Sequence, residues 1–293
     1  KRLSLGKNIR TVGKVGFDES RISHVNIKFS GYIEELYVNF TGTFVKKGDP
    51  LFRVYSPELV ATHEEHLLAL KAKKYFEKSP FKEVSAGSDS LLEAARQRLR
   101  LWDISEEEIE KMEQDGKTIK YVTIYAPSSG VVIEKMAFKG MAVNAGETLY
   151  RIADLSSVWV QADIYEFELP LVKVGQTATI KLSYLPGQNF SGRLNYIYPY
   201  LEPQTRTAKV RFDVSNSAGK LKPDMYADVE LKIDLGKSLA VPNEAVLDTG
   251  VRQMVFLDRG NGLFEPREVR LGQRVDEYQV VLDGLREGDR IVT

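Results

Sequence analysis

An internal repeat, interrupted by a helix-forming segment, constrains the fold more than any other feature of the sequence. Its two copies cover residues 31–54 and 130–152. Each copy places three glycines and a closing Leu-aromatic-Arg-aliphatic run in the same order: Gly31, Gly42, Gly48 and Leu51–Val54 in the first, and Gly130, Gly140, Gly146 and Leu149–Ile152 in the second. Short β runs separated by glycines that permit positive φ predict half of a small all-β sandwich. We therefore expect the two halves to pair around a pseudo-twofold axis and to bury faces that neither half buries alone.

The segment between the copies is rich in Leu, Ala, Glu, Lys and Arg and predicts helices. Ser56 can cap the first free backbone N–H groups, and Pro57 suits the first helical position. A first helix is expected over residues 57–78 and a second from about Asp89, with residues 79–88 breaking the helix between them. The sequence thus predicts a helical hairpin inserted between the two halves of the sandwich.

A short third helix is predicted after the hairpin. Ser105 is followed by Glu108 three residues later, which is the pattern of a capping box. Ile109 and Met112 would then lie on one side of this helix.

The remainder of the chain predicts two further β modules. Strand-like runs alternate with turn signals at short, even spacing over residues 158–233, which is typical of a small β-barrel. A last block follows Val241-Pro242 and contains a hairpin turn at Gly260–Gly262. Residues 1–21 are assigned with residues 236–293 to this last module, although their strand-like run could instead add to the barrel.

Composition and charge exclude several classes of function. The 293 residues carry 41 basic and 41 acidic side chains, and this zero net charge argues against nucleic-acid binding, which usually requires a basic surface. The absence of cysteine excludes thiol catalysis, disulfides and cysteine-based metal sites. No run approaches the ~20 apolar residues that cross a bilayer, and no signal peptide begins at Lys1, so we expect a mature or trimmed fragment.

The order of these modules resembles that of a known protein family. Split sandwich halves around a helical hairpin, followed by a β-barrel and a C-terminal β module, are similar to the periplasmic adaptor, or membrane fusion protein, family of efflux systems. The resemblance covers nearly the whole chain, and within the family it is greatest to the copper/silver (CusB-type) branch of RND-type heavy-metal systems. Five segments carry it: Gln204–Ala208, Leu221–Met225, Val241–Val246, Arg98–Ile109 and Thr123–Gly130.

The resemblance implies a mainly β, multi-domain, elongated protein with four parts. These are a biotinyl/lipoyl-like β-sandwich (22–56 and 117–154), an inserted α-helical hairpin (57–116), a β-barrel (155–235) and a membrane-proximal β domain (1–21 and 236–293). It also implies a location in the periplasm of a Gram-negative cell, attached to or facing the inner membrane.

The implied function is that of an adaptor with neither catalytic activity nor a cofactor. It would link an inner-membrane RND pump to an outer-membrane, TolC-like channel for the export of Cu or Ag ions, and it would self-associate into a ring, expected to be a hexamer. No nucleic-acid partner is expected. The alternatives are an adaptor of the same architecture for divalent metals (Zn, Co, Ni), drugs or secreted proteins, a free metal chaperone, and a lipoyl- or biotin-type carrier component of an enzyme. The carrier would need a modified lysine at the turn between the sandwich halves, where the helical hairpin stands instead.

Few side chains qualify as metal ligands, and none is assigned. For transient binding of Cu(I), Ag(I) or Zn²⁺, the candidates are the thioethers of Met136 and Met141, which flank a turn, and the imidazoles of His63 and His66. The two histidines lie three residues apart, which places them on neighbouring positions of one helix face. Core packing of the methionines and a partly exposed helix face for the histidines are the alternative interpretations.

The sequence contains no catalytic motif and no phosphate-binding loop. For docking to the outer-membrane channel, the resemblance points to the tip of the helical hairpin. The candidate contact residues there are Ser79, Phe81, Lys82 and Ser88.

Overall fold

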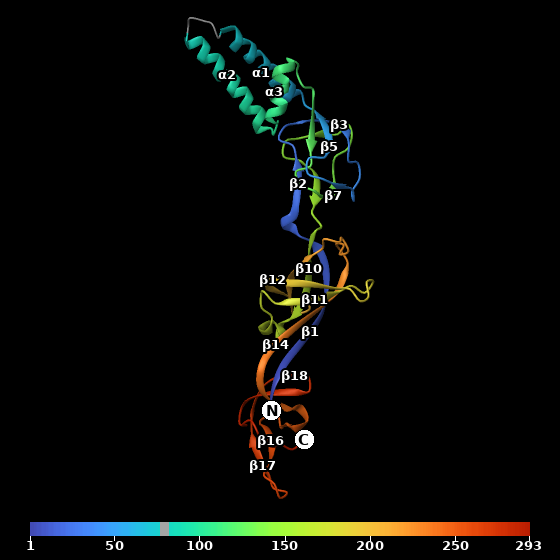
Figure 1. Ribbon diagram of the computed structural model, residues 1–293, viewed down its shortest axis with the longest axis vertical. Helices are drawn as coiled ribbons and strands as arrows, with labels where there is room; N and C mark the ends of the chain where they lie inside the picture. The colour runs from blue at the N-terminus through green and yellow to red at the C-terminus, as the bar shows by residue number, and fades with distance from the viewer. Residues whose placement is uncertain (77–81) are drawn as a thin grey trace. The chain divides into compact units, whose positions relative to one another are not determined.

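The computed structural model describes residues 1–76 and 82–293. The chain divides into two compact units, one formed by residues 17–156 and the other by residues 1–16 together with residues 157–293 (Figure 1). Both units contain β-sheets, and the first also carries the three α-helices of the described residues, so the fold is mainly β and multi-domain as predicted. Within the described ranges, no helix has the length and apolar character needed to span a membrane.

The first unit contains a β-sandwich built from both copies of the repeat. Its strands are β2 (Ile22–Asn26), β3 (Gly31–Leu36), β4 (Phe44–Val45), β5 (Pro50–Tyr55), β6 (Tyr121–Tyr125), β7 (Gly130–Lys135), β8 (Ala142–Val143) and β9 (Thr148–Ala153), and η1 (Glu19–Arg21) is a short 3-10 helix before them. They form two antiparallel four-stranded sheets, in the orders β2-β9-β7-β4 and β6-β5-β3-β8. Each sheet takes strands from both copies, so the predicted pairing of two halves is confirmed.

In each copy of the repeat, the backbone approaches itself most tightly where an equivalent glycine begins β3 or β7. A Cβ atom on Gly31 would lie 2.4 Å from the carbonyl oxygen of Tyr55, and one on Gly130 would lie 2.5 Å from the carbonyl oxygen of Ala153. The turns beyond these strands are also equivalent, since the N–H of Gly48 donates to the carbonyl of Ala126 and the N–H of Gly146 donates to the carbonyl of Ile27, at 2.9 and 2.8 Å. Glycine is therefore required at the start of both strands, because the neighbouring backbone leaves no room for a Cβ atom.

The centre of the sandwich repeats the same twofold relation. Phe52 and Tyr150 occupy equivalent positions of the repeat and stack on each other, with ring centroids 5.6 Å apart. The hydroxyl of Tyr150 donates to the carbonyl of Val38 at 2.7 Å, and burial raises the pKa of Tyr150 to about 12. Burying the tyrosine ring thus depends on this one hydrogen bond to satisfy its hydroxyl group.

Three helices interrupt the sandwich between β5 and β6. They are α1 (Pro57–Phe76), α2 (Lys82–Leu101) and α3 (Glu106–Asp115), and Figure 1 shows α3 beside the other two. The backbone N–H of Leu59 donates to the Ser56 hydroxyl at 3.2 Å, and the capping box between Ser105 and Glu108 is present. Both predicted helix starts are confirmed.

The second helix begins earlier in the chain than the sequence predicts. We expected residues 79–88 to break the helix, whereas α2 already begins at Lys82. Gly87 lies in the exposed part of α2 with nothing within 4 Å of the position of a Cβ atom. Because a glycine inside a helix costs only about 1 kcal/mol relative to alanine, favourable packing of the following residues can extend the helix through it.

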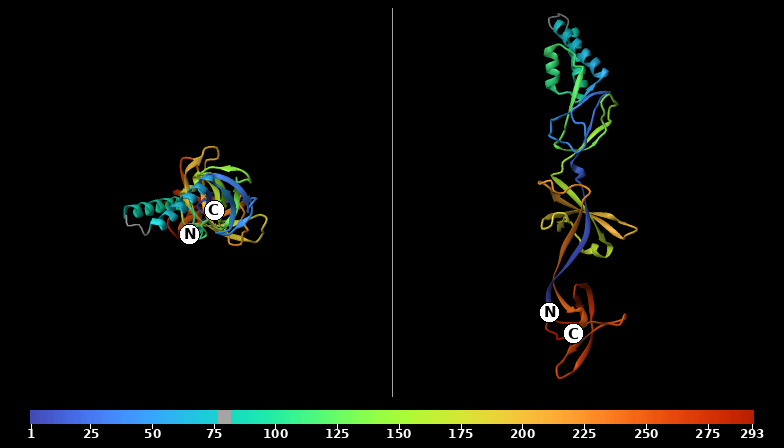
Figure 2. Two further views of the ribbon diagram at one scale, coloured as in Figure 1. Left: turned by 90° about the horizontal axis from the view of Figure 1, so that it is seen from above. Right: turned by 90° about the vertical axis from the view of Figure 1, so that its right-hand side faces the viewer.

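The second unit contains a closed barrel of six strands. They are β1 (Arg2–Phe17), β10 (Ser157–Tyr165), β11 (Thr177–Lys181), β12 (Asn189–Glu202), β13 (Thr207–Ser215) and β14 (Tyr226–Pro242), with η2 (Glu166–Leu171) after β10. The order β1-β10-β13-β12-β11-β14 closes because β1 also pairs with β14, and the two strands run side by side in Figure 2. The barrel predicted from the spacing of the strands is confirmed.

The first strand belongs mainly to this barrel and not to the last module. Ile9 and Val15 are buried in the barrel core, and residues 6–14 pair with residues 226–234 of β14. Only Arg2–Ser4 run alongside residues of the range 236–293, where β14 continues. The placement of residues 1–21 with that range therefore holds for the first residues alone, because the apolar side chains of β1 fit the barrel interior.

A smaller β module follows the barrel. It contains η3 (Asn243–Ala245), β15 (Leu247–Asp248), β16 (Gln253–Asp258), β17 (Phe264–Glu268), β18 (Arg270–Val275) and β19 (Tyr278–Asp283). Strands β15, β16 and β17 form one sheet, while β18 and β19 extend the sheet of β14. The predicted hairpin turn at Gly260–Gly262 joins β16 to β17, and its middle residue Asn261 has a φ of 55°.

We predict that Gly130→Ala destabilises the sandwich by about 1–3 kcal/mol, because the new methyl group would overlap the backbone of Ala153. Gly87→Ala is the matched control and should leave stability unchanged or raise it by up to about 1 kcal/mol, since that position is open and helical. Urea unfolding of fluorotryptophan-labelled protein, followed by ¹⁹F NMR, measures both, because Trp102 and Trp159 report one unit each. Equal effects of the two substitutions would contradict the packing argument.

We also predict that Tyr150→Phe costs about 1–2 kcal/mol, because it leaves the carbonyl of Val38 without its donor inside the core. The exposed Tyr32→Phe, on β3 of the same unit, should change stability by less than about 0.5 kcal/mol. The same unfolding measurement compares them. A Tyr150→Phe protein as stable as Tyr32→Phe would show that the buried hydroxyl contributes nothing.

Candidate functional site

The tip of the helical hairpin is the surface that the sequence proposes for docking. Ser79 and Phe81 lie outside the described residues, and Lys82 is the first residue of α2. Ser88 lies on α2 with only 7% of its surface exposed. Of the four candidates, Ser88 is therefore placed inside the hairpin packing, and docking at the tip stays a prediction.

The charged side chains below the tip mainly hold the helices to one another. Arg98 of α2 pairs with Glu65 of α1 at 2.9 Å, and Lys73 of α1 pairs with Asp89 of α2 at the same distance. Glu106 of α3 accepts hydrogen bonds from Arg96 and Arg100 of α2. These ion pairs are exposed and each contributes little to stability, but together they link α1 to α2 and α2 to α3.

The two candidate histidines lie inside this arrangement. His63 is 1% exposed and His66 is fully buried, which contradicts the expectation of a partly exposed helix face. The Nδ1 atom of His63 lies 3.0 Å from the carbonyl oxygen of Ile119, and the Nε2 atom of His66 lies 2.8 Å from a carboxylate oxygen of Glu113. Helix α3 and the residues after it cover both imidazoles, so the histidines join α1 to α3.

A metal site at this position lacks further ligands. Among residues 1–76 and 82–293, no group of three or more His, Cys, Asp or Glu side chains is arranged to hold a metal ion. The Nε2 atom of His63 and the Nδ1 atom of His66 are buried without a hydrogen-bond partner in the described structure. Each imidazole thus uses one ring nitrogen in a contact that joins α1 to α3 or to the residues after it. This is the arrangement expected of histidines with a structural role.

Burial is the main cause that lowers the pKa of His63 below its ordinary value. The nearby imidazole of His66 lowers it further, while the Ile119 carbonyl and Glu108 act in the opposite direction. The neutral imidazole is therefore favoured in the folded protein. A proton on His63 would place a charge between the helices.

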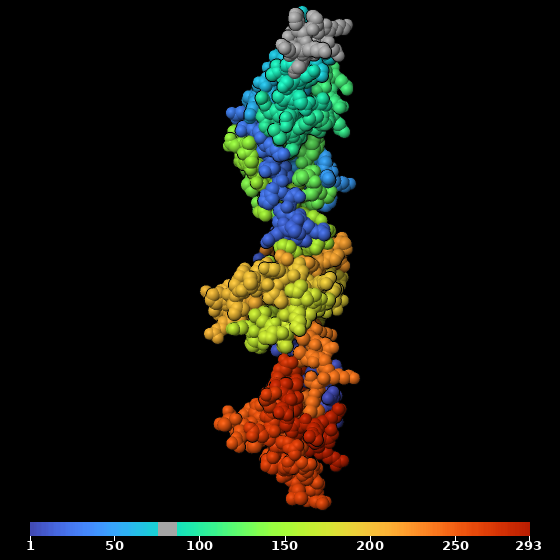
Figure 3. All heavy atoms as spheres, turned by 90° about the vertical axis from the view of Figure 1, so that its left-hand side faces the viewer, coloured from blue at the N-terminus to red at the C-terminus, as the bar shows by residue number. Residues whose placement is uncertain are grey.

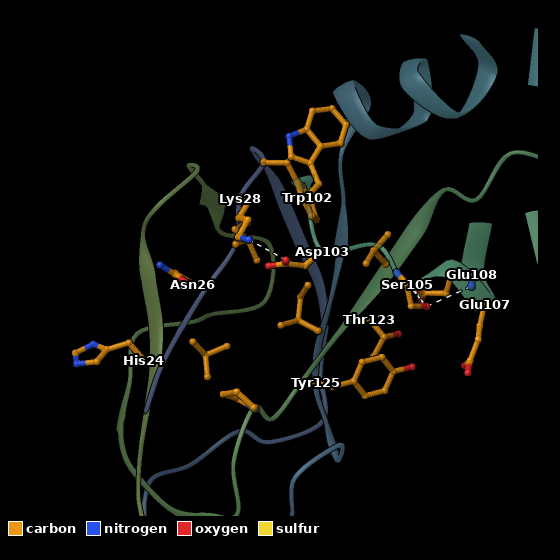
Figure 4. A pocket seen from close by; sticks show the side chains of 16 residues that line it. His24, Asn26, Lys28, Trp102, Asp103, Ser105, Glu107, Glu108, Thr123 and Tyr125 are labelled. Carbon is orange, nitrogen blue, oxygen red and sulfur yellow. Dashed lines mark hydrogen bonds and ion pairs between the residues drawn. The ribbon is translucent and has the colours of Figure 1, made fainter. Parts of the chain in front are cut away.

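A groove lies beside this cluster, between the start of the sandwich and the turn from α2 to α3 (Figure 4). Its volume is about 550 Å³, and its walls include Trp102 and Tyr125. Trp102 packs against Phe29 with ring centroids 6.1 Å apart, and the ammonium group of Lys28 pairs with the carboxylate of Asp103 at 2.8 Å. These two contacts join the hairpin base to the sandwich within the first unit.

Sequence analysis assigns no role to this groove, although Trp102 and Asp103 lie within a segment that carries the family resemblance. Asp103 has a φ of 61°, a conformation that aspartate adopts more readily than most residues and that ends α2 sharply. The contact with Lys28 depends on a tertiary approach, and spacing along the chain does not reveal it. Charged residues, among them Lys28, Asp103 and Glu107, line the groove together with the aromatic Trp102 and Tyr125.

The methionines are dispersed over the fold. Met136 is 41% exposed, whereas Met141 packs partly buried against the sandwich core. Met112 is buried with 1% exposure, and Met225 packs against the barrel core. Met112 and Met225 therefore serve as core residues, and a metal role for Met136 and Met141 stays a prediction.

Three family models match the chain in the order of its modules. The CusB barrel-sandwich hybrid domain matches residues 22–153, the CusB-like β-barrel domain matches residues 157–234, and the CzcB C-terminal circularly permuted SH3-like domain matches residues 239–293. Together these matches identify the chain as a membrane fusion protein, with CusB-like models over the sandwich and the barrel and a CzcB-type model over the last module.

Curated relatives agree with this membership of the membrane fusion family. The putative membrane fusion protein SilB of Salmonella typhimurium is 28% identical over 95% of this chain and 62% of its own length. The cation efflux system protein CusB of Escherichia coli K12 is 28% identical over 95% of this chain and 65% of its own length. The cobalt-zinc-cadmium resistance protein CzcB of Cupriavidus metallidurans is 28% identical over 95% of this chain and 55% of its own length. The chain thus spans less than two thirds of the length of these relatives, which are adaptor proteins and not enzymes.

Solved structures show the same fold. The crystal structure of ZneB from Cupriavidus metallidurans is 26% identical, covers 99% of this chain and 89% of its own, and superposes with a TM-score of 0.50. A MacA–MexA chimera containing the Pseudomonas aeruginosa MexA α-hairpin domain is 22% identical and superposes with a TM-score of 0.67. The match covers 100% of this chain and 98% of the chimera. A membrane fusion protein fold with an inserted hairpin therefore accounts for both units.

We predict that the unit holding the hairpin of this membrane fusion protein loses stability as the pH falls below the ordinary histidine value of 6.5. The unfolded chain then binds a proton at His63 that the folded protein resists, so the contribution of His63 is complete above that pH and is lost below it. His63→Asn keeps an amide donor for Ile119 and removes the titration. ¹⁹F-detected urea unfolding at pH 5 and pH 7.5 should show a smaller pH dependence in the variant, and an unchanged pH dependence would contradict this assignment.

Proposed function

We propose that this chain is the adaptor subunit of a heavy-metal efflux assembly, linking an inner-membrane RND pump to an outer-membrane channel. The observation that carries the proposal is the match over 95% of the chain to proteins named for cation efflux and for cobalt-zinc-cadmium resistance. The metal ion is the cargo of the assembly.

Copper or silver is the narrower proposal for the exported ion. It is supported by the CusB-type models that match the sandwich and the barrel. The alternative, a divalent ion such as zinc, cobalt or nickel, is supported by the CzcB-type model of the last module and by a nickel-cobalt-cadmium resistance relative, NccB, that is 25% identical over 86% of the chain. Drugs or secreted proteins as cargo have no comparable support among these relatives.

The proposed location is the periplasm, attached to or facing the inner membrane of a Gram-negative cell. We further propose that copies of the chain assemble into a ring, a hexamer by analogy with the family, around the pump. In this arrangement the hairpin tip, including Ser79, Phe81 and Lys82, would contact the channel. A long helical insertion supports the proposal, because helices present regular ridges to helical partners.

The carrier alternative is not favoured by the architecture. A lipoyl or biotin carrier needs a lysine on the tight turn between its two sandwich halves. In this chain α1, α2 and α3 lie between those halves, after β5 and before β6. The intact mass of native material tests this alternative. We expect it to equal the mass of the unmodified polypeptide.

The proposed role predicts that deleting the gene from its host lowers tolerance to the exported metal. Growth should be measured in Cu, Ag, Zn, Co and Cd salts, with the deletion complemented by the full-length wild-type gene, by a hairpin-deleted gene and by Gly87→Ala as the matched control. We expect wild type and Gly87→Ala to restore tolerance, at least severalfold in inhibitory concentration, and the hairpin deletion to fail despite equal protein levels. Recovery for Cu and Ag alone would support the narrower proposal, and unchanged tolerance to every metal would contradict metal export.

A further inference from the structure

The outer face of the barrel carries a layer of aromatic and charged side chains across three neighbouring strands. In the antiparallel register of β10, β13 and β12, Arg211 lies opposite Gln161 on one side and opposite Tyr196 on the other. Side chains that alternate with these residues, such as Val160, Val210 and Phe212, are buried in the barrel core. Arg211 and its neighbours therefore project from the outer surface of the barrel. Figure 3 draws the atoms of the barrel segment that contains β12 and β13 in yellow to gold.

The guanidinium group of Arg211 is held in place by aromatic rings. Its central carbon lies 3.9 Å from the ring centroid of Trp159 and 5.3 Å from that of Tyr196. The guanidinium lies over the indole, and Trp159 is only 8% exposed although its side chain projects from the outer face. Such stacking of a planar cation on aromatic faces restricts its motion before any partner arrives.

A hydrogen-bond network fixes the same group from a third direction. The Nε–H of Arg211 donates to the Oδ1 atom of Asn195 at 2.9 Å, and the amide of Asn195 in turn donates to Asp213. Asn195 lies at a register shift between Leu194 and Tyr196, which lets its side chain reach toward β13. Asn195 and Asp213 thus act as positioning residues for the guanidinium.

The terminal amino groups of Arg211 carry no ion pair with any carboxylate of the described residues. Neighbouring cations on the barrel differ in this respect, since Lys209 pairs with Asp163 at 3.1 Å and Lys181 pairs with Glu230 at 2.8 Å. The side chain of Arg211 is half-buried and its orientation is fixed, so its free N–H groups present a fork suited to two carboxylate oxygens.

Three tyrosines extend the surface beside this fork. Tyr196, Tyr198 and Tyr200 follow one another on β12 with edge-to-face contacts, at centroid distances of 5.1 and 5.8 Å. Gln161 donates to the hydroxyl of Tyr198 at 3.3 Å, and Tyr200 is 62% exposed. Tyrosine, tryptophan and arginine are the residues most enriched at the energetic centres of protein interfaces.

We propose that this face of the barrel, centred on Arg211 and flanked by Tyr196 and Tyr200, binds an acidic segment of a partner protein through one of its carboxylates. The carboxylate lies in the plane of the guanidinium and accepts two hydrogen bonds, while the tyrosine rings cover the apolar part of the segment. Charge complementarity favours an acidic partner, because Arg211 makes no direct ion pair within the described residues and reaches the carboxylate of Asp213 only through Asn195. The inference stands on the barrel alone and does not depend on which metal is exported.

The experiment uses the full chain labelled with ¹⁵N at arginine and tryptophan, with acetyl-Glu-Glu-amide as the probe. We expect saturable shifts of the Arg211 Nε–H and Trp159 indole signals, with a dissociation constant in the millimolar range as befits a single contact. Acetyl-Gln-Gln-amide, which keeps the shape and removes the charge, should bind at least about tenfold more weakly. Added salt should weaken the binding of the acidic probe.

Two arginine variants separate a specific fork from general attraction. Arg211→Lys keeps the positive charge but loses the planar pair of donors, and we expect at least a threefold loss of affinity, read on the Trp159 signal. Arg274→Lys changes an exposed arginine of the last module and should leave affinity unchanged. Equal binding of both peptides, equal effects of the two variants, or no saturable shift in a protein whose Trp159 signal stays native would each overturn the proposal.

Discussion

The first unit depends on one steric constraint, the close approach of backbone to backbone where the two copies of the repeat begin their first strands. Gly31 and Gly130 leave no room for a side chain because a carbonyl oxygen from the end of the same copy lies against each of them. That approach lets β3 pair with β8 and β7 pair with β4, so each sheet is completed by the other copy. Neither copy can bury its apolar face alone, which makes the sandwich a single cooperative structure formed by two distant segments.

The position of the hairpin follows from this arrangement. The chain leaves the sandwich after β5 and returns at β6, and these two strands pair with each other. A long insertion between paired strands is therefore anchored at both of its ends by the sandwich. The buried histidines, the Lys28–Asp103 ion pair and the Phe29–Trp102 contact add fixed points at the base. A hairpin that is anchored in this way can carry a docking tip without needing a core of its own.

Much of this fold could be predicted from the sequence, and the physical reasons can be named. Repeated glycines mark turns and close approaches, alternating apolar residues mark strands, and Ser56 and Ser105 mark helix starts because side-chain oxygens satisfy free N–H groups there. The features that were missed depend on tertiary contacts. The apolar side chains of β1 could fit either β module, and only pairing with a strand far along the chain places them in the barrel.

In the candidate site too, local features were predicted from the sequence and tertiary contacts were not. The spacing of His63 and His66 placed them correctly on one helix face, but it could not show that α3 covers that face and buries both rings. On the barrel, the strands were predicted, whereas the register shift at Asn195 that joins Arg211 to its support is a property of the sheet. The proposed docking surfaces are assembled from several strands or helices, and a motif search along the chain does not detect such surfaces.

The central claim is that the two copies of the repeat form one cooperative sandwich, and native-state hydrogen exchange tests it most directly. The amide of Gly48 donates to a carbonyl preceding the second copy, and the amide of Gly146 donates to a carbonyl preceding the first. If each copy completes the other, both amides and those of β5 and β9 should exchange through one opening with one common free energy. Protection that persists in one copy while the other opens at a clearly lower free energy would contradict the account.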